Sequence, residues 1–400
     1  MPGGPGGNFM EQFLADLLRM MGSGMGAASA KVDMARAMAQ GVATGGEPEG
    51  NVDPLARMAV ESVLQVAELH VAEITGLPVE GRLQVDAVGA GSWAQQTVDD
   101  WAYILEVAGQ AAVVPPRQAE EDGGPGAGIG EFLAQAMSTM GPVLAAMQLG
   151  SAVGHLARTT MGQYELPVPR PDGRRGRLLV VPANLDRFAA DWSLSPDDVR
   201  LWVCLRDVTV HAALGRAPVA DRFRDLLAAV ARTTAEDNAR ALHGMEGLDL
   251  GNPEALQQLL GEPEALLGTE PSPGRRRAAD ELAAASLALA GYVEHVLDRA
   301  AARLLGGRGA LGEAWRRWQV DRDASDRAAE ALLGLDLGPA QVDRGSAFVA
   351  GVVARAGDDA LGRLWSDAAG LPTPAEIDAP GLWLERTALA GLDRPGDSDR

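Results

Sequence analysis

Apolar residues recur at helical spacing along most of the chain. In residues 54–75 and 278–305 they lie three or four positions apart, and Gly76 and Pro78 follow the first of these runs. The same pattern predicts helices elsewhere. These further helices are expected over residues 9–21, 93–107, 131–163, 196–214, 219–243, 313–320, 326–333, 342–356 and 359–368.

Only one segment has the character of a strand. Residues 177–182, RLLVVP, are rich in leucine and valine and are bounded by Gly176 and Pro182. Among so many helical segments, one strand is a minor component. The sequence therefore predicts a fold that is mainly α with a small β element.

The helix at 196–214 has the clearest start signal. Ser195 is a good N-cap, and Pro196 suits the first helical position. Asp197 and Asp198 then place two carboxylates at the positive end of the helix dipole. This helix should begin sharply and end at Gly215.

Composition shifts divide the chain into four parts. Residues 1–50 are expected to be a mobile segment with one amphipathic helix, and residues 51–390 a helical domain. Residues 244–274, which are rich in glycine, proline and acids, predict a long surface loop or lid. Residues 391–400 are expected to form a disordered tail.

Charge and hydropathy restrict the function. The 400 residues include 35 Lys and Arg and 55 Asp and Glu, giving a net charge of −20 and a pI near 4.7. A nucleic-acid binder needs a basic surface, so that class is excluded. We expect no membrane insertion, because even the apolar run 141–157 is interrupted by polar residues, and we read Gly150 and Gly154 within it as sites of close helix packing. The N-terminus lacks the features of a secretory signal, which favours a cytoplasmic location.

Several segments, in order, resemble one protein family. They are PDDVRLWVCLRDVTVHAAL at 196–214 and the stretches 147–169, 178–202, 287–305 and 332–386. Together they resemble an actinobacterial family of zinc-dependent metalloproteases or hydrolases with a zincin-like fold. The resemblance covers about residues 130–390 and implies a helical bundle around a metal site.

The resemblance also implies which residues should carry the chemistry. The family's H-E-x-x-H motif places two histidines on one helix face to bind zinc, with the glutamate acting on zinc-bound water. Aligned without gaps, the two histidine positions are Arg206 and Val210, and the glutamate position is Asp207. The family's third ligand, a glutamate on a later helix, corresponds to Ala290 just before Gly291.

None of the three ligand positions keeps a metal ligand. Arginine stays protonated and offers no lone pair, and valine and alanine have no donor atoms. Asp207 retains a carboxylate, but one carboxylate does not hold zinc tightly, and without the metal the hydrolytic route closes. We therefore expect zinc, the family's cofactor, to be lost and Asp207 to be inactive as a general base.

The sequence leaves three alternative functions to be tested. The first is a catalytically inactive homologue whose inherited cleft binds a peptide or protein partner. The second is an active metal-dependent hydrolase with displaced ligands, for which Asp207, His211 and Glu294 are the candidates, because 207 and 211 share a helix face and 294 lies one turn beyond 290. The third is an acidic scaffold or interaction protein that uses its N-terminal helix.

Overall fold

The computed structural model describes residues 28–77, 83–111, 127–174, 176–246, 271–304 and 309–392. Within these ranges the chain is mostly helical, and its two strands form a single parallel sheet. The expected fold class, mainly α with a small β element, is confirmed. The expected helix at 9–21 and most of the expected lid, residues 247–270, lie outside the described residues.

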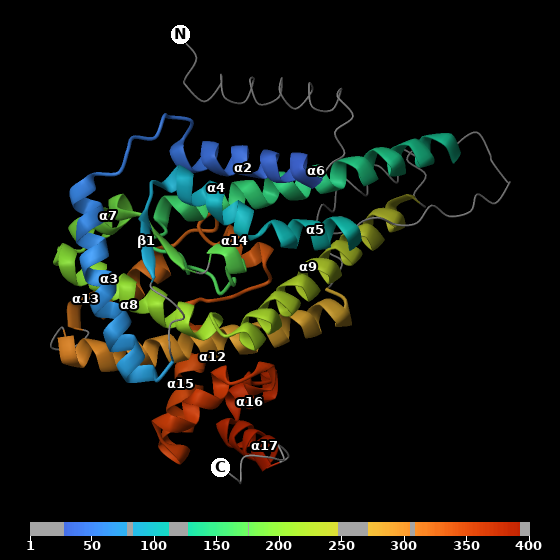
Figure 1. Cartoon of the computed structure of the whole chain (residues 1–400). Coiled ribbons are helices and arrows are strands. Elements are labelled where there is room, and N and C mark those ends of the chain that lie inside the picture. The colour runs from blue at the N-terminus through green and yellow to red at the C-terminus, as the bar shows by residue number, and fades with distance from the viewer. Residues whose placement is uncertain are drawn as a thin grey trace.

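The N-terminal elements cover one side of the molecule, where α2 lies along α6 in the upper part of Figure 1. The elements as far as the sheet are α2 (Ala28–Thr44), α3 (Pro54–Thr75), β1 (Gln84–Ala87), α4 (Ala90–Asp100), α5 (Ala102–Ala111), α6 (Ala127–Thr159), η1 (Asp172–Arg174) and β2 (Arg177–Val180).

The second half of the described chain places long helices below the sheet and the C-terminal helices beyond them (Figure 1). Its elements are α7 (Pro182–Asp191), α8 (Pro196–Leu214), α9 (Ala217–Glu246), α12 (Pro273–Leu304), α13 (Gly309–Asp321), α14 (Ala328–Leu332), α15 (Pro339–Ala356), η2 (Asp358–Trp365), η3 (Ala368–Gly370), α16 (Pro374–Asp378) and α17 (Pro380–Leu392).

Several expected boundaries need correction. The expected helix at 93–107 is two helices separated at Trp101, and the segment 359–368 is mainly a 3-10 helix. The chain stays helical as far as Leu392, so the expected tail begins later than residue 391. The bounds of α3 and α8, by contrast, match the sequence prediction.

Residues 1–50 are not a mobile segment throughout, because α2 belongs to the core. Its Ala35 and Ala39 are fully buried. A Cβ atom at Gly150 of α6 would lie 2.4 Å from the carbonyl oxygen of Ala35, and one at Gly154 would lie 2.7 Å from that of Ala39. The two glycines therefore allow α2 and α6 to touch through their backbones, as the sequence indicated. The folded unit begins before residue 51.

The first strand, β1, was missed by the sequence analysis. It pairs in parallel with β2, with Val85 opposite Leu178 and Ala87 opposite Val180. Its four residues, QVDA, are too few for a clear alternation, and Asp86 interrupts them.

No helix in the described part of the chain has the length and apolar character that crossing a bilayer requires.

Helix α8 lies at the centre of the molecule. The Ser195 hydroxyl accepts a 3.4 Å hydrogen bond from the Asp198 amide, so the predicted N-cap is present. The helix packs against α3 on one side and against α12 on another. Helix α12 is held in turn against α15 where Gly291 meets Gly345, since a Cβ atom on either would lie only 2.0–2.2 Å from the backbone of the other helix. Helix α12 therefore packs against both α8 and α15, and the site lies between α8 and α12.

Candidate functional site

The three positions that the resemblance aligns with the family's zinc ligands line one cavity. Arg206 and Val210 extend from α8, and Ala290 faces them from α12. The cavity measures about 110 Å³ and is also lined by the segment that precedes β2 and by residues of α13 to α15. Positions 80 residues apart in the chain thus share one small space, which makes this cavity the candidate site.

Arg206 places a positive charge inside the cavity. One guanidinium nitrogen lies 3.5 Å from Asp207 Oδ1, and another lies 3.7 Å from Glu165 Oε2. The centre of the guanidinium lies 5.2 Å from the ring centroid of Trp315, within the range of a cation–π contact. The Arg206 side chain is only 14% exposed. Its charge is therefore held by two carboxylates and an aromatic face.

Asp207 does not line the cavity. Its side chain is 1% exposed, and Oδ2 accepts a 2.5 Å hydrogen bond from the backbone amide of Gln163. Burial raises the pKa of Asp207 to about 7, while the charge of Arg206 and the amides of Gln163 and Tyr164 act in the opposite direction. At the position of the family's general base, this carboxyl group is buried and is bound to a loop.

The displaced ligand set does not form a site. His211 Nδ1 lies 3.0 Å from the Tyr164 hydroxyl, and only Glu294 of the three candidates lines the cavity. No group of three His, Cys, Asp or Glu side chains is arranged to hold a metal ion in the part of the chain that the structure describes. Within the described residues, Asp207, His211 and Glu294 are therefore not brought together as a metal-binding group.

Whether zinc fits positions 206, 210 and 290 depends on the donor atoms that their side chains offer. The side chains facing the cavity from these positions are a guanidinium, an isopropyl group and a methyl group. Zinc in proteins is bound by imidazole nitrogen, thiolate sulfur or carboxylate oxygen. The three residues present therefore do not fit the family's metal.

The loop between α6 and β2 positions the acidic partner of Arg206. The carbonyl of Gly162 accepts a 2.9 Å hydrogen bond from the Trp93 indole, and that of Thr160 a 2.6 Å bond from the Asn184 amide. Glu165 itself accepts a 3.2 Å bond from the Met161 amide. Sequence analysis missed Glu165, because a loop residue gives no periodic signal. The only signal in the sequence was that the segment YELPVP at 164–169 lies within one of the stretches that resemble the family.

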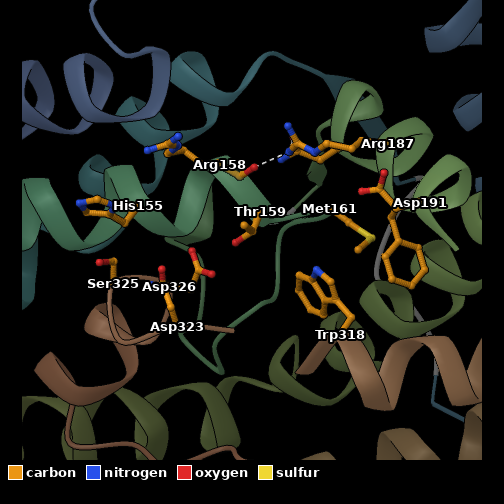
Figure 2. A pocket seen from close by; sticks show the side chains of 12 residues that line it. His155, Arg158, Thr159, Met161, Arg187, Asp191, Trp318, Asp323, Ser325 and Asp326 are labelled. Carbon is orange, nitrogen blue, oxygen red and sulfur yellow. Dashed lines mark hydrogen bonds between the residues drawn. The ribbon is translucent and has the colours of Figure 1, made fainter. Parts of the chain in front are cut away.

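A second, larger cavity lies on the other side of an aromatic pair. It measures about 520 Å³ and contains Trp318, whose ring centroid is 5.0 Å from that of Trp315 in the smaller cavity. Figure 2 shows Arg187 directed at the carbonyl of Arg158, with Asp323, Ser325 and Asp326 gathered near His155. None of the candidate ligand positions faces this space. His155 is half-buried on its wall.

Comparison with known proteins now assigns the ancestry. A crystal structure from Chloroflexus aurantiacus, described as a candidate hydrolase with a novel fold, is similar to this structure with a TM-score of 0.58. The two chains are 22% identical, and the match covers 90% of this chain and 98% of the other. A comparison with curated proteins gave no match. A family model described as zincin-like metallopeptidase matches residues 31–384, and the chain therefore belongs to the zincin-like metallopeptidase family.

Proposed function

We propose that this chain is a zincin-like metallopeptidase homologue that no longer binds catalytic zinc, and that its inherited cavity binds a peptide or protein partner. The observation that carries the proposal is the position of Arg206. At the first histidine position of the family motif, its guanidinium lies in the cavity between Glu165 and the Trp315 ring. A fixed positive charge there opposes a divalent cation.

The fate of the general base supports the same function. A family hydrolase needs a carboxylate that can reach metal-bound water. Asp207 instead uses its carboxyl group to accept backbone hydrogen bonds from the loop, and it does not line the cavity. The ligand positions thus hold side chains that do not bind zinc, and the carboxyl group at the base position is bonded to the loop. The cavity between α8 and α12 is nevertheless present.

The first test is metal content. Elemental analysis of the purified protein should find zinc far below one equivalent. The triple variant Arg206→His, Val210→His and Ala290→Glu should gain measurable zinc affinity, because it restores two imidazoles and a carboxylate around one space. The matched control, Val210→His with Ala290→Glu, keeps the guanidinium and should bind zinc much more weakly. One equivalent of zinc in the unmodified protein would refute the proposal.

The scaffold hypothesis makes a different prediction. If the N-terminal segment recruits the partner, its removal should abolish binding. Deletion of residues 1–50 is unsuitable for this test, because α2 contributes to the core. Deletion of residues 1–27 leaves α2 in place. Under the proposal made here, this truncated chain retains its partner with unchanged affinity.

A further inference from the structure

Resting on the proposed function, we infer that the cavity recognises the C-terminal carboxylate of a peptide whose last residue is small and aliphatic. The inference starts from the unused donors of Arg206. Its distances to Glu165 and Asp207, 3.7 Å and 3.5 Å, are those of ion pairs and exceed the usual length of a charge-assisted hydrogen bond. The planar fork of N–H groups is therefore available to a planar, two-oxygen acceptor.

A second polar group points to the same ligand. Ser286 lies on α12 one turn before Ala290 and lines the cavity. It is 1% exposed, and among the residues that the structure describes its hydroxyl oxygen has no hydrogen-bond partner. A buried hydroxyl without a partner is costly, so a ligand that accepts its hydrogen bond is favoured. A carboxylate has enough acceptor positions for both the guanidinium and this hydroxyl.

The remaining wall is aliphatic. Val210 follows Arg206 by one helical turn on α8, and Leu289 and Val293 face it from α12. In a C-terminal residue the carboxylate and the side chain leave the same Cα atom, so a carboxylate beside Arg206 places the side chain in the same cavity as these aliphatic residues. A cavity of about 110 Å³ suits a small side chain such as that of valine.

Charge on the lining explains why the ligand should carry only one negative charge. Glu330 is already paired with Arg322 at 2.8 Å, and Asp343 with Arg316 at 3.5 Å. Glu294 adds a further carboxylate to the lining. Because the two lining arginines are already paired, a peptide with an additional acid next to its terminus would meet the carboxylate of Glu294 and bind less well.

Tryptophan fluorescence can follow binding, because Trp315 lies in the cavity. The probes are N-acetyl-dialanyl-valine with a free carboxylate and the same peptide as its C-terminal amide, titrated to millimolar concentration into the full chain. The acid should bind at least about tenfold more tightly than the amide. Equal binding of the two peptides would overturn the carboxylate inference while leaving a peptide-binding role intact. Binding of neither would overturn it as well.

Variants locate the recognition. Arg206→Gln should remove the preference for the acid, and Arg206→Lys should restore only part of it, because an ammonium lacks the planar fork. Ser286→Ala should weaken the acid several-fold without affecting the amide. Arg200→Gln is the matched control on the same helix, since Arg200 pairs with Asp186 and Asp197 outside the cavity, and it should keep the full preference. Preference retained in Arg206→Gln would overturn the inference, and zinc analysis of the same samples tests the proposed function separately.

Discussion

Helix α8 presents two polar faces with different uses. On the face toward the loop, Asp207 and His211 are buried and bonded to Gln163 and Tyr164. On the face toward the cavity, Arg206 is held by ion pairs and an aromatic ring. Residues 206 and 207 are adjacent in the chain, yet Asp207 is bonded to the loop and Arg206 faces the cavity. The comparison shows that a polar residue on a helix does not belong to the site merely because it is polar.

The largest expected effect comes from the loop face. Asp207→Ala removes the acceptor of two backbone amides and should lower the free energy of unfolding by about 2–4 kcal/mol. Urea denaturation measures the loss. Asp198→Ala is the matched control, since Asp198 is exposed in the first turn of the same helix and should cost at most about 1 kcal/mol. Equal losses would contradict a structural role for Asp207.

The close contact between α12 and α15 provides the next test. Gly345→Ala places a methyl group 2.0 Å from the Leu287 carbonyl oxygen, and the overpacking should cost about 1–3 kcal/mol. Gly109→Ala, in α5, meets no atom within 4 Å and should be neutral or stabilising by up to about 1 kcal/mol. Thermal denaturation of both variants decides the point. A Gly345 variant as stable as the Gly109 variant would show that α12 and α15 do not need this close contact.

Counted per pH unit, the smallest expected effect is a dependence of stability on pH. The pKa of Asp207 is about 7 in the folded chain and near 3.8 as an unperturbed group, so between these values the folded state holds a proton that the unfolded state has lost. This contribution to stability is complete below the unfolded pKa and disappears as pH rises toward 7. The slope should reach about 1.4 kcal/mol per pH unit. Denaturation across pH 5–8 should show a shallower slope in Asp207→Asn, and identical slopes would contradict the shifted pKa.

Local signals in the sequence were sufficient for the strongest elements. Pro54 to Thr75 and Pro196 to Leu214 form helices with the predicted bounds, because a capping residue at the start and glycine at the end act within a few residues. The strand β1 and the helix α2 were missed. β1 is too short to show a period, and α2 is a core helix inside a segment rich in glycine and alanine.

The site was only partly predictable for a related reason. The family resemblance identified positions 206, 210 and 290, and the structure brings these three into one cavity. It could not indicate Glu165 or Ser286, since a loop acid and a buried hydroxyl resemble many others in the sequence. Whether a polar group is satisfied depends on neighbours that are distant along the chain.

By itself, the sequence determined the helical character of the chain, its ancestry, and the absence of metal-binding atoms at three aligned positions, because these follow from local periodicity and from the chemistry of single side chains. Only the tertiary structure decided that Asp207 turns to the loop while Arg206 turns to the cavity. The hydrogen bonds, burial and ion pairs that separate these two neighbours come from segments that folding brings together.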